Sequence, residues 1–273
     1  MTSTEIGAGV GHADGWRPKL IALDVDGTIV GYDESLSPAV ADAVAAVRAV
    51  GIPTVIATGR SLHSTTDLCR TLGMVDGPVV CSNGAVIADI ATDQPTDVMT
   101  FDPTQSVRYF ADQLPDATLA VEDIGIGYRM TGEFPVGELT GRITVVSHDD
   151  LIRGPVTRLI VRWAGGDREH LFRLAHEAGL EGVDYAIGYS AWLDFMPAGV
   201  SKASALDLIA RRIGATAADV LAIGDGHNDL EMLTWAGHGV AMGHAPPDVR
   251  EVADEVCAPV TDDGLADVLT RYL

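Results

Sequence analysis

Two aspartates, Asp24 and Asp26, stand at the end of a short apolar run near the start of the chain. The run itself, Leu-Ile-Ala-Leu at positions 20–23, has the character of a strand that is buried on both faces. Because alternate side chains of a strand point to the same side, we expect the two carboxylates to point the same way. Two anions held together at a strand end are costly unless a cation or a shared proton relieves them. The pair therefore predicts a partner elsewhere in the chain.

Two later apolar runs also end on polar side chains, one on Thr58 and one on Asp225, and a predicted helix begins near Lys202. In an open parallel sheet the carboxyl ends of the strands lie along one edge, where ligands bind, so we expect these side chains to converge with the first aspartates. Oxygen ligands without histidine favour a hard ion, Mg²⁺ rather than zinc. A hard cation, a lysine, a hydroxyl and a free carboxylate together describe a phosphoryl-transfer site.

Strands and helices alternate on both sides of a central stretch of different character. Strands are predicted over 20–23, 52–58, 79–81, 220–225 and 239–242, and helices over 38–50, 61–72, 201–213, 227–236 and 265–272. This alternation predicts an α/β fold with a Rossmann-like, doubly wound parallel sheet as its core. In the central stretch, an alternating strand over 157–163 and an amphipathic helix over 167–178 instead predict an inserted α+β cap domain.

We therefore expect a flexible tail over residues 1–17, a core domain over 18–88 and 197–273, and a cap domain over 89–196. The tail lacks the basic start and apolar centre of a signal peptide. No charge-free apolar run approaches the roughly 20 residues of a membrane helix, so we expect a cytoplasmic protein without a membrane partner.

The chain has 273 residues and a formal net charge of −21. This negative charge argues against binding to nucleic acid, because nucleic-acid-binding proteins carry basic patches. It still allows a small anionic substrate to bind where positive charge is locally concentrated. The three cysteines are scattered without a metal-binding or disulfide spacing, which predicts buried structural thiols.

Five short motifs follow one another in an order that is known from one enzyme superfamily. They are Asp24-Val-Asp-Gly-Thr28, Ala57-Thr-Gly-Arg60, Ser82-Asn-Gly-Ala85, Gly199-Val-Ser-Lys202 and Gly224-Asp-Gly-His-Asn-Asp229. With them the chain resembles the haloacid dehalogenase superfamily of phosphatases, and within it the Cof-like group. The motifs cover the core on both sides of the cap. Within the cap, the resemblance rests mainly on the position and size of this domain. It implies a Mg²⁺-dependent phosphatase that hydrolyses small phosphorylated metabolites, such as sugar phosphates or similar phosphomonoesters, through an aspartyl-phosphate.

The resemblance also implies roles for individual residues. Asp24 resembles the nucleophile and Asp26 the general acid/base. Mg²⁺ would be held by Asp24, the backbone carbonyl of Asp26, and Asp225, while Asp229 would orient Lys202 or a metal-bound water. The residues implied to bind phosphate or substrate are Thr58, Gly59, Arg60, Asn83, Lys202 and Asn228.

Two histidines lie near these motifs without an implied role. Family members often carry asparagine where this chain has His244, which puts a loop contact near the site in doubt. His227 is most simply a solvent-facing loop residue. The cap arginines are either substrate clamps or, more simply, members of a solvated sheet face; they are Arg129, Arg142, Arg158 and Arg162.

Other functions also fit part of the pattern. A calcium-binding EF-hand does not, because positions six and twelve of such a loop would be Ile29 and Ser35. A phosphomutase or a specialised sugar-phosphate phosphatase of the same superfamily stays possible. So does a phospho-accepting signalling module, which also combines an acidic group, a threonine and a lysine around Mg²⁺. The sequence leaves the substrate and the oligomeric state open.

Overall fold

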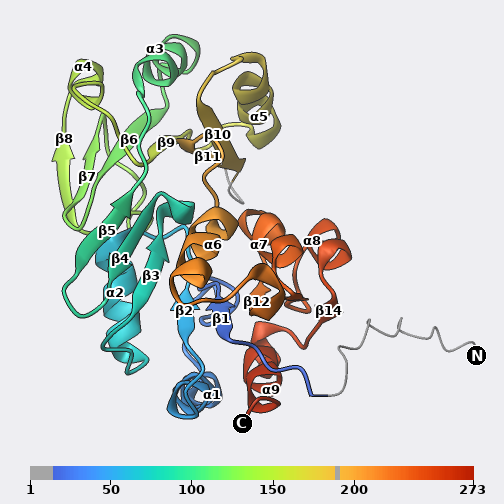
Figure 1. Cartoon of the computed structure of the whole chain (residues 1–273). Helices are drawn as coiled ribbons and strands as arrows, with labels where there is room; N and C mark the ends of the chain where they lie inside the picture. The colour runs from blue at the N-terminus through green and yellow to red at the C-terminus, as the bar shows by residue number, and fades with distance from the viewer. Residues whose placement is uncertain (1–14, 188–190) are drawn as a thin grey trace, which may run out of the picture. The chain divides into compact units, whose positions relative to one another are not determined.

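The computed structural model describes residues 15–187 and 191–273 and divides the chain into two compact units (Figure 1). Unit 1 is formed by the two ends of the chain, up to Val55 and from Asp207 onward, and unit 2 by Ile56–Leu206. Most of the predicted tail, residues 1–14, lies outside the described residues. The predicted cap falls within unit 2, and its boundaries stay a prediction. In the described part of the chain, no helix has both the length and the apolar character needed to cross a bilayer.

Unit 1 is built on a five-stranded sheet with the order β14-β13-β12-β1-β2. Its strands are β1 (Leu20–Leu23), β2 (Thr54–Ile56), β12 (Val220–Gly224), β13 (His238–Ala241) and β14 (Glu255–Val256). The neighbours β1 and β12, β12 and β13, and β13 and β14 are parallel. The chain passes from β1 to β2 on one side and returns to β12 on the other, so the direction of winding reverses between β1 and β12. This confirms the predicted doubly wound parallel sheet and places its switch point there.

Local signals explain the first helix of this unit. The Ser37 side chain accepts a hydrogen bond from the Ala39 N–H, and Pro38 fills the first helical position. Buried residues recur on one face and pack this helix against the last one; each fully buried valine contributes about 1.5–3 kcal/mol. The helices of unit 1 are α1 (Pro38–Ala49), α7 (Leu230–Trp235), α8 (Pro247–Val252) and α9 (Gly264–Thr270), with short 3-10 turns η2 (Ala217–Asp219), η3 (His227–Asp229) and η4 (Val260–Asp262). α6 (Lys202–Arg212) begins in unit 2 and ends in unit 1.

Unit 2 begins with α2 (Leu62–Thr71) and a three-stranded antiparallel sheet. Its strands are β3 (Pro78–Cys81), β4 (Val86–Asp89) and β5 (Gln94–Val98), and η1 (Ser82–Gly84) connects the first two. Residues 79–81 form a strand as predicted, and this strand also pairs antiparallel with β4, which the sequence analysis did not predict. A parallel bridge from Ala57 to Val80 also links this strand to the end of β2. The cause of the antiparallel pairing is η1, which turns the chain back immediately after β3.

The rest of unit 2 is a six-stranded sheet with the order β10-β11-β9-β6-β7-β8. Its strands are β6 (Thr118–Asp123), β7 (Gly127–Met130), β8 (Arg142–Val145), β9 (Leu159–Arg162), β10 (Val183–Ile187) and β11 (Trp192–Pro197). All neighbours are antiparallel except β7 and β8. The helices α3 (Thr104–Gln113), α4 (His148–Leu151) and α5 (Arg168–Glu177) share one apolar core with alternate residues of β6, β9 and β11. This confirms the α+β character predicted for the cap.

The three cysteines are free thiols in the interior of their units: Cys69 and Cys81 are buried and Cys257 is half-buried. Burial raises the pKa of Cys257 to about 11, and it raises the pKa of Cys81 still further. Only the thiolate reacts quickly with disulfide reagents.

We expect native protein to react slowly with 5,5′-dithiobis(2-nitrobenzoate) at pH 8, where about one Cys257 in a thousand is ionised. Its reaction rate should rise about tenfold for each pH unit towards the pKa. In denaturant all three thiols should react at once, which gives the control. A thiol that reacts stoichiometrically within seconds at pH 7 in native protein would contradict the structural role.

Candidate functional site

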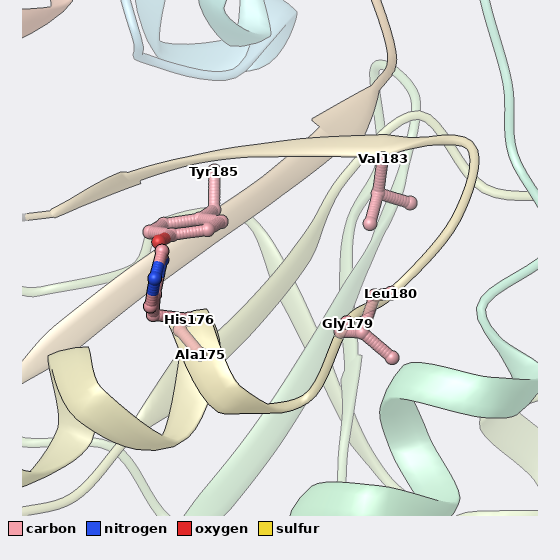
Figure 2. A pocket seen from close by; sticks show the side chains of 6 residues that line it. All are labelled: Ala175, His176, Gly179, Leu180, Val183 and Tyr185. Atoms are coloured by element: carbon pink, nitrogen blue, oxygen red, sulfur yellow. The ribbon is translucent and has the colours of Figure 1, made fainter.

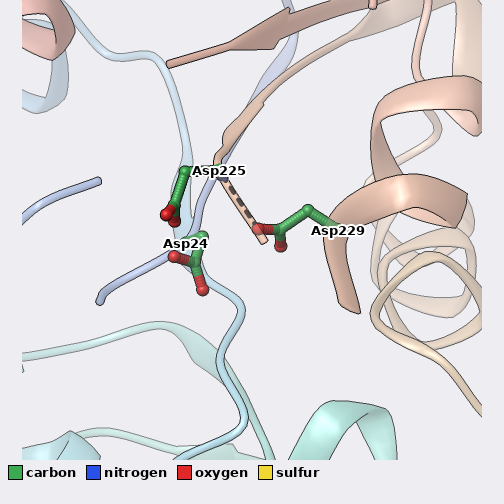
Figure 3. Close-up of side chains that lie close together, drawn as sticks. All are labelled: Asp24, Asp225 and Asp229. Carbon is green, nitrogen blue, oxygen red and sulfur yellow. Dashed lines mark hydrogen bonds between the residues drawn. The ribbon is translucent and has the colours of Figure 1, made fainter. Parts of the chain in front are cut away.

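Three buried carboxylates meet at the switch point of the parallel sheet (Figure 3). Asp24 follows β1 and Asp225 follows β12, and the ends of these neighbouring strands are in register through Leu23 and Ile223. With Asp229 they bring one carboxylate oxygen each to within 4.8 Å of one another. Their relative exposures are 4%, 1% and 0%. Because buried like charges repel, and because all three ligand atoms are oxygens, this cluster fits a hard divalent cation.

Side chains of three other residues approach Asp225. Its Oδ2 accepts a hydrogen bond from the Tyr32 hydroxyl, and Thr28 Oγ1 lies 3.4 Å from its Oδ1. His244 Nε2 is 3.4 Å from Asp225 Oδ2. His244 Nδ1 accepts the Val260 N–H at 3.3 Å, which holds the ring in place beside this carboxylate. The histidine without an implied role therefore lies beside a predicted metal ligand.

Asp229 holds the turn that presents Asp225. Its Oδ2 accepts the backbone N–H groups of Asp225 and Gly226 at 3.0 and 2.9 Å. Two such bonds to a carboxylate fix the turn after β12 more firmly than neutral acceptors would. In the same loop Asn228 is half-buried, and Nε2 of the exposed His227 lies 3.0 Å from Asp248 Oδ2. That contact agrees with the simple interpretation of His227 as a surface loop residue.

Gly27 makes room for Asp225. Its φ is +88°, and a Cβ atom at this position would lie 2.3 Å from Asp225 Oδ2. Only glycine meets both requirements, the left-handed backbone and the missing side chain. The preceding Asp26 is half-buried, whereas Asp24 is almost fully buried. The two aspartates of the opening motif therefore differ in their access to solvent.

Unit 2 brings together a second group of predicted residues. Thr58 is fully buried, and its Oγ1 accepts the Arg60 N–H at 3.1 Å. The Asn83 N–H donates to the Thr58 carbonyl at 3.0 Å. The Asn83 side chain also lies against Gly59, where an added Cβ would be 3.0 Å from Asn83 Oδ1. The turns after β2 and β3 are thus fastened to each other.

The start of α6 lies against the same turns. Lys202, its first residue, is fully buried. A Cβ atom added to Gly84 would lie 2.2 Å from the Ser201 carbonyl oxygen, so the backbone before Lys202 packs directly on η1. A buried ammonium is stable only among anionic or polar groups, which suits a residue predicted to bind phosphate.

The cap arginines are mostly paired with acidic side chains. Arg162 pairs with Glu138, Arg129 with Asp123, and Arg158 with Asp194. The interpretation of Arg158 as part of a solvated face is wrong, because the residue is 7% exposed. Alternation along a strand reveals which residues share a face but not what covers that face.

Two residues beside these sites were missed by the sequence analysis, and neither belongs to a motif. They are Tyr32, which contacts Asp225, and Glu122, whose Oε2 accepts a hydrogen bond from the Ser82 hydroxyl in η1. His244 was noted only as a departure from the family pattern. The signal for Glu122 is a carboxylate directly after the buried run Leu119–Val121 in β6.

A small pocket lies between α5 and β10, apart from these residues (Figure 2). It is lined by Ala175, His176, Gly179, Leu180, Val183 and Tyr185. The lining contains no lysine, arginine or carboxylate, and none of its residues belongs to the predicted site. Its chemistry is not that of a phosphate or metal site.

Comparison with known proteins gives one family. A family model of haloacid dehalogenase-like hydrolases matches residues 21–125 and 167–269. The phosphoglycolate phosphatase of Natronomonas pharaonis is 31% identical over 92% of this chain and 96% of its own. The 5-amino-6-(5-phospho-D-ribitylamino)uracil phosphatase of Bacillus subtilis is 26% identical over 94% and 98%. A solved haloacid dehalogenase-like hydrolase from Bacteroides thetaiotaomicron is 25% identical, with a TM-score of 0.80 over 94% of this chain and 100% of its own.

A divalent cation should stabilise the protein through the carboxylate cluster. At 100 times its dissociation constant, Mg²⁺ should raise the free energy of unfolding by about 2.7 kcal/mol, measured as an increase in Tm. The Asp225→Asn variant should lose this increase. Without Mg²⁺ it should be at least as stable as wild type, because one like charge has been removed.

The control is Asp248→Asn, which neutralises an exposed carboxylate outside the cluster and should keep the full increase. Sodium chloride at equal ionic strength separates screening from binding. An equal response of both variants to Mg²⁺ would rule out the carboxylate cluster as the metal site.

Proposed function

Because the chain belongs to the haloacid dehalogenase-like hydrolases, we propose that it is a Mg²⁺-dependent phosphatase of small phosphorylated metabolites that works through an aspartyl-phosphate. The observation that carries this proposal is the buried cluster of Asp24, Asp225 and Asp229 at the switch point of the sheet. The relatives named for phosphoglycolate and for a ribitylaminouracil phosphate support substrates of this size and charge.

We assign the metal to Asp24, the backbone carbonyl of Asp26, and Asp225. The buried like charges of the cluster and its all-oxygen ligand atoms support this set. A Mg²⁺ ion held by these residues would offset their negative charge and would supply positive charge to the phosphoryl oxygens. Asp229 supports the site from behind, since it fixes the turn that carries Asp225.

Asp24 is the nucleophile in this proposal. Its carboxylate oxygen forms a bond to phosphorus while the bond from phosphorus to the leaving oxygen breaks. The alcohol departs with a proton, and an acyl phosphate remains on Asp24. Dividing hydrolysis into two displacements is the advantage of such a covalent intermediate. The low exposure of Asp24 supports this role, because it keeps the carboxylate poorly solvated.

Asp26 is the general acid and base. It gives its proton to the leaving oxygen and then takes a proton from the water that attacks phosphorus, which releases inorganic phosphate and restores Asp24. The half-buried environment of Asp26 supports this assignment, because the group must reach both the substrate and water. The left-handed turn at Gly27 changes the direction of the chain directly after Asp26.

Thr58 and Lys202 bind the transferred phosphoryl group in this proposal, and Asn228 contributes a further contact. Gly59, Arg60 and Asn83 line the entrance. The support is the order of the motifs together with the clustering of the turns that carry Thr58, Asn83 and Lys202 within unit 2. Lysine and hydroxyl donors supply the local positive field that a chain of net charge −21 needs for an anionic substrate.

Product analysis separates this function from its alternatives. A phosphatase releases inorganic phosphate, whereas a phosphomutase gives an isomer of its substrate. A phospho-accepting signalling module would keep its aspartyl-phosphate for minutes without turning over an ester. A screen of sugar phosphates, nucleotides, phosphoglycolate and pyridoxal phosphate with Mg²⁺ identifies the substrate class.

Asp24→Asn should lower kcat by about 10⁴-fold or more, because the amide cannot form the acyl phosphate. The measurement is steady-state release of inorganic phosphate from the best ester of the screen. Asp67→Asn is the matched control, since it neutralises an exposed aspartate of α2, and it should keep wild-type turnover. Normal turnover in a folded Asp24→Asn protein would refute the assigned nucleophile.

Asp26→Asn should lower kcat by about 10²–10⁴-fold for alkyl phosphates, whose leaving group needs a proton. The formation of the aspartyl-phosphate from p-nitrophenyl phosphate should be affected much less, because nitrophenolate leaves unprotonated. Single-turnover release of nitrophenol and of an alcohol measures the two cases. Equal losses for both leaving groups would contradict the acid role of Asp26.

A further inference from the structure

The six-stranded sheet has a polar face opposite the helices α3, α4 and α5. Alternate residues of β6, β9 and β11 point into the helix-covered core, so their neighbours point to the other side. On that side Tyr128 and Ile160 belong to a small second cluster. Glu122, Arg158 and Asp194 share this side by alternation, and all three are buried. Such charged groups are rarely buried unless they are paired and serve a purpose.

Arg158 fixes one end of this face to the turn after β2. It forms a fork with Asp194, from Nε to Oδ1 at 2.6 Å and from Nη2 to Oδ2 at 2.8 Å. Its remaining Nη1 donates to the Gly59 carbonyl oxygen at 2.9 Å and lies 3.4 Å from the Tyr128 hydroxyl. The fork fixes the guanidinium in one orientation. The bond to Gly59 is therefore made by a group that cannot easily turn away.

Glu122 reaches the turn after β3. Its Oε2 accepts hydrogen bonds from the Ser82 hydroxyl and from Thr157 Oγ1, the latter at 3.2 Å. Burial raises the pKa of Glu122, against the lowering effect of Ser82, Arg158, Thr157 and the Leu62 backbone. In the described part of the chain its buried Oε1 has no hydrogen-bond partner. An apolar residue would avoid this desolvation cost, so the carboxylate is poorly explained by packing alone.

The turn that Glu122 contacts is held in an unfavourable backbone conformation. Ser82, Asn83 and Gly84 have successive φ values of 50°, 54° and 104°. Glycine adopts such values freely and asparagine tolerates them, whereas serine adopts them only when its surroundings enforce them. The Ser82 N–H donates to the Arg60 carbonyl oxygen at 2.9 Å, which ties this turn to the one after β2. The bond from the Ser82 hydroxyl to Glu122 is the additional side-chain restraint.

We propose that Glu122 and Arg158 are positioning residues that fasten the polar face of the six-stranded sheet to the turns bearing Thr58, Arg60 and Asn83. These hydrogen bonds hold the two turns in a fixed position relative to the sheet. The sheet thereby sets the positions of the residues in the turns that bind a phosphate ester. The inference rests on the proposed phosphatase function. It adds a residue of β6, Glu122, and the residue directly before β9, Arg158, to those that act in the reaction without contacting the metal or the reacting atoms.

Steady-state kinetics of Glu122→Ala and Ser82→Ala test this role. Each should lower kcat/KM by about 10- to 100-fold, the loss expected when a binding group shifts by about 1 Å. Glu122→Gln, which keeps an acceptor for Ser82, should restore most of the activity. The control is Arg162→Ala, which removes the forked pair between this residue of β9 and Glu138. That variant should stay within about twofold of wild type.

A double-mutant cycle with Arg60→Ala shows whether Glu122 acts through the turn. If it does, Glu122→Ala should lower kcat/KM by less than about threefold in the Arg60→Ala background. Independent effects would instead multiply. Hydrogen exchange of the Ser82 and Asn83 amides adds a readout that needs no substrate: it should be faster in Glu122→Ala than in Arg162→Ala.

The outcomes separate the two proposals. Wild-type protein that turns over no phosphate ester would refute the proposed function. Wild-type turnover together with unchanged kcat/KM in folded Glu122→Ala and Ser82→Ala would overturn only the positioning role, as would fully multiplicative effects in the cycle. If Glu122→Ala does not fold, Ser82→Ala decides, because it removes a single hydroxyl from a folded turn.

Discussion

Three carboxylates buried within 4.8 Å of one another are the interaction on which the rest of unit 1 depends. At this separation each pair of unit charges repels by about 3–4 kcal/mol for an effective dielectric constant of about 20. Neighbouring groups reduce this electrostatic repulsion. Two backbone N–H groups donate hydrogen bonds to Asp229, and the Tyr32 hydroxyl and the His244 ring lie close to Asp225. These hydrogen bonds offset part of the repulsion between the three carboxylates, and a bound cation would offset the rest. The cluster is therefore better understood as a binding site than as a structural feature.

Unit 2 also buries charged side chains, but there the charges are of opposite sign and are paired. Its six-stranded sheet has an apolar face covered by helices and a second face that carries buried Glu122, Arg158 and Asp194. There the fork between Arg158 and Asp194 satisfies two charges, and the remaining donor of Arg158 is directed at the Gly59 carbonyl. Buried pairs of this kind add little net stability compared with apolar residues of the same size. Their use is to specify one arrangement of turns over others.

Sequence reasoning predicted what local patterns and topology rules determine. Ser37 and Pro38 marked the start of α1 correctly, and the rule for open parallel sheets brought Asp24 and Asp225 to one edge. It failed where long-range packing decides. The antiparallel pairing of β3 depends on left-handed conformations at Ser82 and Asn83, and serine has no intrinsic preference for that region. The burial of Arg158 was likewise invisible, because alternation along β9 does not reveal that a turn covers its polar face.

The discontinuity of unit 1 has a consequence for the order of events during synthesis. Chains emerge from the ribosome amino end first, and β1 lies between β2 and β12 in its sheet. Its partner β12 begins only at Val220, after the whole of unit 2 has been made. Unit 2 is contiguous and can fold while the apolar strand that precedes Asp24 still lacks this neighbour. Leu20–Leu23 therefore cannot pair with β12 until synthesis has passed Val220, about 200 residues after β1 itself has been made.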